Sequence, residues 1–256
     1  MIKIYKHTQI GLFHKDHCED YVVHADIGRD RVLLAVLDGC TMGTESFFAS
    51  ALIGKLLRKI ARHFFYQESL KGPVLDLETL KKAVLEELHR ELQETKNDLQ
   101  LDKYELLSTI VLGIVDVRAK TGSFIAIGDG AVYTGEKIVV FDQNNAPDYF
   151  AYHLQKPFAE WYQAQEQHLQ LSDIEDISLT TDGVFTFSNL GEEEFPAFSE
   201  KQVVDLLFKD RSDAANDRML LKKTSRLETQ YGLKPTDDLG MIRVILENGT
   251  VGGSDG

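Results

Sequence analysis

Acidic residues stand at the ends of several apolar runs in this chain of 256 residues. The run VLLAVL leads into Asp38-Gly39, and the run ISLTT leads into Asp182-Gly183. Aspartate is depleted inside strands, so a repeated acid where a strand ends needs an explanation. The pattern occurs at Glu19-Asp20, Asp38-Gly39, Asp129-Gly130, Asp182-Gly183 and Asp237-Asp238.

Two explanations fit these acids. An Asp-Gly pair is a common hairpin turn, so each site taken alone favours a turn. However, neither VLLAVLDG nor ISLTTDG is followed by a short return strand. Carboxylates gathered at the mouth of a sheet cannot all stay ionised without cations, and such oxygen ligands suit Mg²⁺ or Mn²⁺ rather than zinc. Gly39 has no side chain, so its carbonyl oxygen could reach the same ion.

The elements that must position these acids follow from the hydrophobic pattern. Strands come in blocks rather than alternating regularly with helices, which favours an α+β fold. Residues 143–172 look irregular and predict a surface flap. We find no repeat and no linker, so we expect a single domain over 1–251 and a disordered tail at 252–256. The expected strands are 2–10, 21–27, 31–37, 108–117, 122–127, 131–133, 138–141, 177–181 and 241–246, and the expected helices are 48–64, 77–97 and two within 198–231.

Composition excludes several classes of protein. The net charge of -13 argues against broad binding to nucleic acid or to anionic membranes. No apolar run reaches the roughly 18 residues of a membrane span, and the first residues lack the apolar core of a signal peptide. The two cysteines do not form a disulfide framework, so we expect a cytoplasmic protein.

The order of the motifs resembles the metal-dependent protein phosphatases of type 2C. The motifs are ED, apolar strand-LDG, STIVL, IGDG, LTTDG and DD before a last apolar strand, and they cover the chain from about Lys15 to Leu246. The resemblance implies two packed antiparallel β-sheets flanked by α-helices, a four-layer α-β-β-α sandwich. It also implies a serine/threonine protein phosphatase, which hydrolyses phosphoserine or phosphothreonine with a metal-bridging hydroxide.

The same resemblance implies roles for individual residues. Two Mg²⁺ or Mn²⁺ ions are expected, with a third ion bound weakly. Lys15 stands where the family places an arginine that binds the substrate phosphate. The expected metal ligands are Asp38 as the bridge, Gly39 through its carbonyl, Asp182 and Asp237 at the second ion, Glu19 and Asp20 near the first ion, and Asp129 at the third.

The chain also departs from the family pattern. Cys40 occupies the position of a histidine proposed as general acid, and a small packed thiol is the simpler interpretation of it. Lysine lacks the bidentate fork of arginine, so Lys15 is also consistent with an ordinary surface residue. The spacing of His14, His17 and His24 matches no zinc pattern, which favours surface or packing roles.

Two alternatives remain for the function. A phosphatase with an aspartyl-phosphate intermediate needs a second aspartate where Cys40 stands, which disfavours it. A catalytically weak or degenerate phosphatase domain that binds phosphoproteins is the second alternative. For the type 2C phosphatase, the expected partners are a phosphorylated protein substrate and a cognate serine/threonine kinase system, and we expect a monomer.

Overall fold

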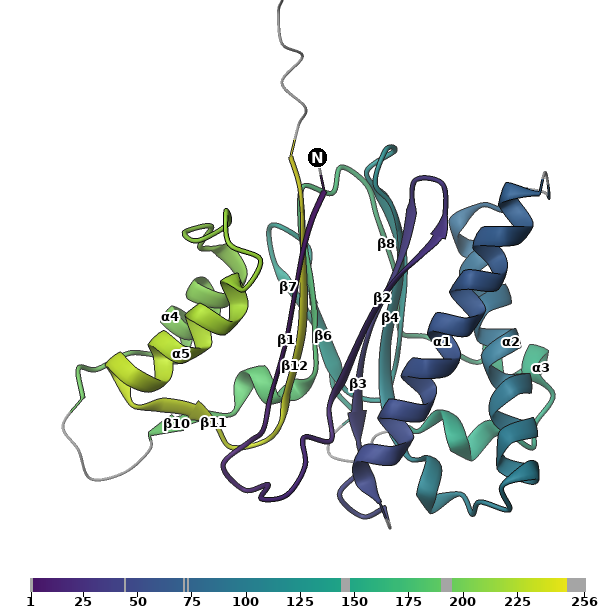
Figure 1. Cartoon of the computed structure of the whole chain (residues 1–256), viewed down its shortest axis with the longest axis horizontal. Coiled ribbons are helices and arrows are strands. Elements are labelled where there is room, and N and C mark those ends of the chain that lie inside the picture. Colours follow the sequence, from purple (N-terminus) through teal and green to yellow (C-terminus); the bar gives the residue numbers. More distant parts are fainter. Residues whose placement is uncertain are drawn as a thin grey trace, which may run out of the picture.

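The computed structural model describes residues 2–43, 45–70, 72, 74–143, 148–189 and 195–247. The tail expected at 252–256 and part of the expected flap, residues 144–147, lie outside these residues. Two five-stranded antiparallel sheets and one two-stranded pair make up the β structure (Figure 1). This confirms the predicted α+β class.

The first sheet holds the strand that ends on Asp38. In spatial order it consists of β2 (Tyr21–Gly28), β3 (Arg31–Gly39), β4 (Ser108–Asp116), β5 (Thr121–Ile127) and β8 (His168–Leu171). The second sheet consists of β1 (Ile2–Gln9), β12 (Leu239–Leu246), β9 (Asp176–Thr180), β6 (Gly130–Tyr133) and β7 (Ile138–Phe141). The short pair is β10 (Phe187–Asn189) with β11 (Leu233–Pro235).

Helices cover the outer face of each sheet, which gives the four predicted layers (Figure 1). The long helices α1 (Ser46–Ser69) and α2 (Leu77–Asp98), with the short α3 (Phe158–Gln163), lie on the first sheet. On the second sheet lie α4 (Glu200–Val204), the π-helical turn η4 (Asp205–Lys209) and α5 (Met219–Tyr231). Single 3₁₀ turns complete the elements: η1 (Tyr104–Leu106), η2 (Phe150–His153) and η3 (Asp182–Phe185).

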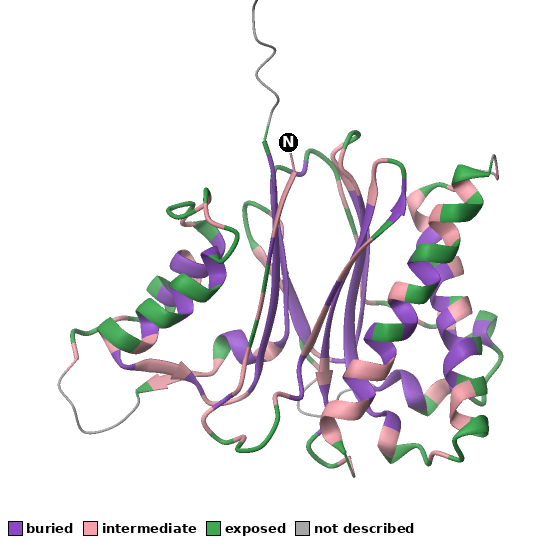
Figure 2. Cartoon of the chain, viewed as in Figure 1, coloured by how far each residue is buried: buried purple, intermediate pink, exposed green. Residues whose placement is uncertain are grey.

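Three hydrophobic clusters separate these layers, and Figure 2 shows the buried faces turned toward one another. One lies under α1 and α2, one between the sheets, and one under α4 and α5. Strand β3 serves two of them. Its odd residues Leu33, Ala35 and Leu37 join the helix-side cluster, whereas Val32, Leu34 and Val36 join the cluster between the sheets. Because strand side chains alternate, Asp38 continues the second row and faces the space between the sheets.

The structure corrects three expectations. Strand β3 does not stop at Leu37 but continues through Asp38 and Gly39, paired with Thr109 and Ser108. The expected flap is not wholly irregular, because its last part forms β8, which pairs with β5. The hairpin explanation of Asp129-Gly130 is wrong, because β5 and β6 belong to different sheets and the pair joins one sheet to the other.

No helix within the described ranges is both long and apolar enough to cross a membrane.

Candidate active site

The acids predicted from the sequence meet at one end of the sandwich, between the two sheets. Asp38 arrives at the end of β3, and Asp20 immediately precedes β2. From the opposite sheet, Asp182 opens η3 just after β9, and Asp237 stands just before β12. Four segments far apart in the sequence therefore bring carboxylates to one edge, as the strand-end pattern predicted.

These carboxylates interact strongly with one another. Burial raises the pKa of Asp38 well above its ordinary value, and the charges of Asp20, Asp182 and Asp237 raise it further. Burial and then Asp237 and Asp129 raise the pKa of Asp182 to about 6. Such mutual raising means that the cluster carries more negative charge than it can hold without a compensating proton or cation.

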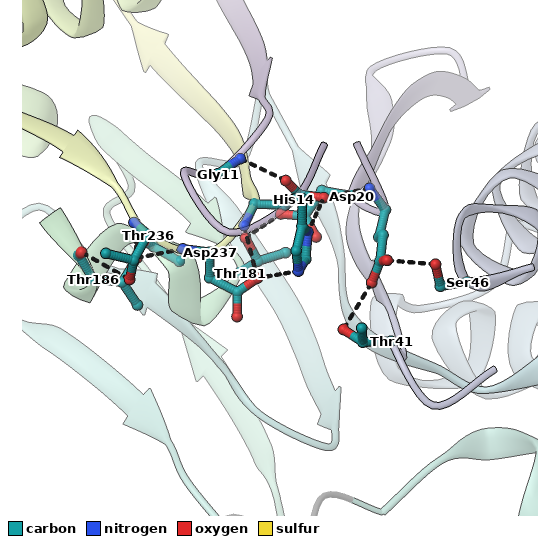
Figure 3. A network of polar contacts seen from close by, with 12 residues as sticks. Gly11, His14, Asp20, Thr41, Ser46, Thr181, Thr186, Thr236 and Asp237 are labelled. Atoms are coloured by element: carbon teal, nitrogen blue, oxygen red, sulfur yellow. Dashed lines mark hydrogen bonds and ion pairs between the residues drawn. The ribbon is translucent and has the colours of Figure 1, made fainter. Parts of the chain in front are cut away.

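Asp20 is the most enclosed member of the cluster. It is 4% exposed, and burial raises its pKa to about 8, although a hydrogen bond from Thr181 opposes this. The Thr181 hydroxyl donates to Asp20 Oδ2 at 2.6 Å (Figure 3). The other oxygen of Asp20, Oδ1, is buried without a hydrogen-bond partner among the described residues.

Asp238 holds the loop that leads to Asp20. This carboxylate is buried, at 2% exposure, and accepts hydrogen bonds from Gly11 N at 2.6 Å and Glu19 N at 2.5 Å. His14 Nδ1 lies 2.9 Å from Asp238 Oδ2. The two ends of the loop from residue 11 to residue 19 are thus hydrogen-bonded to the same side chain, which fixes the position of Asp20 just before β2.

His14 is not the surface or packing residue expected from the sequence. Its side chain is only 15% exposed and lies beside Asp238 and, at 3.6 Å, Asp237 (Figure 3). Burial lowers the pKa of His14, but the carboxylates of Asp238, Glu19 and Asp237 raise it above its ordinary value on balance. When it is protonated, His14 supplies positive charge at the edge of an acidic cluster.

Glu19 faces away from the other acids. Its carboxylate oxygens accept hydrogen bonds from the hydroxyls of Ser46 and, at 3.1 Å, Thr41 (Figure 3). Its backbone carbonyl accepts from Gly39 N at 3.2 Å. Gly39 has no room for a side chain, since an added Cβ would lie 2.1 Å from the Ser46 carbonyl oxygen. Packing alone therefore requires glycine at this position.

Lys15 is exposed and lies outside the acid cluster. It lines a surface pocket of about 390 Å³ together with Phe13, His17 and Glu19, next to the acids. Lys15 and His14 both line this pocket, but only His14 also contacts Asp237 and Asp238.

Asp129 lies at the border of the cluster. It raises the pKa of Asp182 and accepts a hydrogen bond from Gln143 N at 2.8 Å. The chain of contacts continues through Gln143, whose side chain accepts from Asp148 N at 2.5 Å, to His153, whose Nε2 lies 2.6 Å from Asp148 Oδ1. The border acid is therefore connected to the segment that carries η2.

Cys40 and Tyr149 close the cluster on the side of the first sheet. Cys40 is 9% exposed and belongs to the helix-side hydrophobic cluster, which agrees with a packed thiol. Burial, a hydrogen bond with Cys40 and the charge of Asp38 raise the pKa of Tyr149. Tyr149 was not predicted as a site residue, because nothing in its local sequence pattern connects it with β3, which ends more than 100 residues earlier.

The cluster supplies oxygen donors suited to a hard divalent cation, but it is not closed around one. Within the ranges that the structure describes, no group of three or more His, Cys, Asp or Glu side chains is arranged so that it could hold a metal ion. The unpartnered Oδ1 of Asp20 and the mutually raised pKa values fit a site that exchanges protons for cations.

Comparison with solved structures shows which proteins share this fold. A bacterial serine phosphatase variant is 13% identical with a TM-score of 0.62, and the match covers 96% of this chain and 99% of that chain. PppA of Pseudomonas aeruginosa is 16% identical with a TM-score of 0.59, and coverage is 96% and 98%. The phosphatase domain of SpoIIE from Bacillus subtilis is 15% identical with a TM-score of 0.58, covering 96% of this chain and 64% of the SpoIIE chain. At such identities the matches show a common fold.

Sequence comparison gives the family. No curated protein sequence matches the chain. The family model described as protein phosphatase 2C, however, matches residues 6–223, which is most of the chain. With its two-sheet sandwich and its strand-end acids, this chain belongs to the protein phosphatase 2C family.

Proposed function

We propose that this chain is a metal-dependent phosphatase that hydrolyses phosphoserine or phosphothreonine in proteins. One observation carries the proposal: Asp20, Asp38, Asp182 and Asp237 come from four separate segments to one edge, where burial and the charges of neighbouring acids raise the pKa values of Asp20, Asp38 and Asp182. Buried carboxylates that repel one another are costly to keep, and a cation site gives them a use.

The residues present suggest how ions would be held. Asp38 would bridge two Mg²⁺ or Mn²⁺ ions, with Asp182 and Asp237 on one of them and the Gly39 carbonyl on the other. Asp20 would complete the site through its unpartnered Oδ1. When bound, two such ions supply an activated water as nucleophile and withdraw charge from the phosphoryl oxygens.

Glu19 and Asp129 would act at greater distance. Glu19 is held by the Ser46 and Thr41 hydroxyls, so it can order water near the first ion rather than bind it directly. Asp129, at the border, would contribute to a third and weaker ion.

Protein side chains then bind and orient the substrate. Lys15 at the pocket entrance can contact the phosphate as a point charge. His14, fixed by Asp238, adds a second positive group close to Asp237. A phosphorylated protein, supplied by a serine/threonine kinase, is the substrate that this arrangement implies.

A second candidate function is a weak or degenerate phosphatase domain that binds phosphoproteins. Two observations favour it: the described residues contain no closed metal-binding group, and Lys15 is exposed and forms no ion pair with an acid in the described part of the chain. Phosphate binding would then persist without hydrolysis.

Hydrolysis of matched peptides distinguishes the two functions. We expect release of phosphate from phosphoserine and phosphothreonine peptides with Mn²⁺ or Mg²⁺, and none after chelation. Retained binding of these peptides without metal-dependent release would establish the binding module. Trapping of a phosphorylated enzyme would contradict direct attack by water.

A further inference from the structure

Helix α1 carries a concentration of positive charge that the catalytic proposal does not use. From Ser46 to Gln67 it contains no Asp or Glu, although the whole chain has a net charge of -13. Its basic residues are Lys55, Arg58, Lys59 and Arg62. Apart from Glu68 in its last turn, α1 contains no acidic residue, so it makes a local positive field that attracts anions.

Part of this helix borders a pocket against β2. The pocket has a volume of about 330 Å³, and its lining includes His24, Arg58, Arg62, Phe65 and Tyr66. Asp26 also lines it and opposes the positive charge. Burial lowers the pKa of His24, and the positive charges of Lys6 and Arg58 lower it further. The negative charge of Asp26 raises this pKa, but by less than Lys6 lowers it. The potential at His24 is therefore positive on balance.

Several donors around the pocket have no partner. Arg58 is fixed by bonds from Nη1 to the Tyr21 hydroxyl at 2.6 Å and from Nη2 to the Val22 carbonyl at 3.2 Å, which use two of its five N–H groups. Arg62 makes no hydrogen bond or ion pair with any residue that the structure describes. His24 Nδ1 is buried and likewise lacks a partner in the described part of the chain.

We propose that this pocket binds a short acidic segment of a partner protein, whose carboxylate or phosphate groups pair with Arg58 and Arg62 in the lining and with exposed Lys6 of β1, outside the lining. Arg58 is held in place and Arg62 is unpaired among the described residues, so the two can bind an anionic side chain. The half-buried Phe65 ring and the exposed Tyr66 ring suit an apolar neighbour of that side chain. The pocket begins about 13 Å along β2 from Asp20, so it is separate from the acid cluster. The acidic surface elsewhere disfavours extended polyanions, which would meet repulsion outside this small area.

Fluorescence anisotropy with a fluorescein-labelled hexaglutamate peptide and the full chain tests the proposal. We expect saturable binding that weakens as salt increases. The double variant Lys6→Gln/Arg62→Gln should weaken binding about tenfold, the size expected when two surface charge contacts are lost. Arg62→Lys should retain most of the affinity.

A matched control lies on the same helix. Lys59→Gln makes the same charge change as Arg62→Gln, but Lys59 pairs with Glu91 at 2.6 Å, away from the pocket. It should bind the peptide as wild type does, and all variants should show wild-type thermal unfolding. Equal weakening by Lys59→Gln, or wild-type affinity of the double variant, would overturn the proposal. So would preferential binding to phosphatidylserine vesicles, or a concentration-dependent dimer abolished by the double variant, because each assigns the pocket to another occupant.

Discussion

The neighbouring acids Asp237 and Asp238 should differ in their effect on stability when their charge is removed. Asp238 is buried and accepts hydrogen bonds from Gly11 N and Glu19 N. The Asp237 side chain is 46% exposed, lies near His14 and, among the described residues, accepts a hydrogen bond only from Asp238 N, at 2.8 Å. We therefore expect Asp238→Asn to lower the free energy of unfolding and Asp237→Asn to leave it nearly unchanged.

The magnitude follows from the hydrogen bonds. A hydrogen bond to a charged group contributes about 1.5–3 kcal/mol. Asparagine keeps only one acceptor oxygen, so Asp238→Asn loses one of the two hydrogen bonds from backbone N–H groups. The free energy of unfolding should therefore fall by about 1.5–3 kcal/mol, reduced by the repulsion with Asp20 that the variant removes. Asp237→Asn keeps the acceptor for Asp238 N and should change stability by less than about 0.5 kcal/mol.

Urea unfolding in the presence of a chelator measures both variants without a contribution from metal binding. Activity gives the complementary readout. Asp237→Asn should lose metal-dependent hydrolysis at normal stability, whereas Asp238→Asn should lose stability first. Equal stability losses in the two variants, or a wild-type urea midpoint for Asp238→Asn, would refute the assignment of Asp238 as the loop anchor.

Three further predictions concern single residues. Lys15→Ala should raise KM several-fold and Lys15→Arg should preserve or improve it, and unchanged kinetics for both would make Lys15 an ordinary surface residue. Asp129→Ala should lower kcat while calorimetry still shows the two inner ions, and normal kcat with reduced stability would instead indicate a turn residue. Burial raises the pKa of Glu78, but hydrogen bonds led by that of Lys81 outweigh it and lower the pKa from 4.5 to about 2. The ionised Glu78 therefore stabilises the fold above pH 4.5, and this contribution is lost as the pH falls toward 2. The urea midpoint of Glu78→Gln should therefore depend less on pH below 4.5, by a modest amount since the side chain is 42% exposed, and an unchanged acid dependence would contradict this.

The α+β class was predictable because most strands show their burial in their own residues, and the family resemblance implied the four layers. Strand β3 is apolar on both faces, and it lies between the helix-side cluster and the cluster between the sheets. The position of Asp38 follows from the same alternation. Local patterns predicted the pairs β4–β5 and β6–β7, whereas the division into two packed sheets came from the family resemblance. The assignment of one domain over 1–251 stays a prediction.

The supporting residues of the site were not predictable in the same way. His14, Asp238 and Tyr149 act through contacts with residues distant in sequence, and their neighbours along the chain give no periodic signal. Strand β8 was missed because its residues are half-buried or exposed and show no apolar run. The basic pocket combines β2 with α1 and has no continuous motif.

Titration of the full chain with Mn²⁺, comparing wild type and Asp38→Asn by calorimetry, tests the central claim most directly. If Asp38 bridges two ions between the sheets, wild type should bind two Mn²⁺ ions, and Asp38→Asn should bind at most one, with loss of hydrolysis. The variant should be at least as stable as wild type without metal, because it removes one charge from a cluster whose members repel one another. Absence of Mn²⁺ binding in wild type, or two ions bound equally well by Asp38→Asn, would contradict a shared metal site at the end of β3.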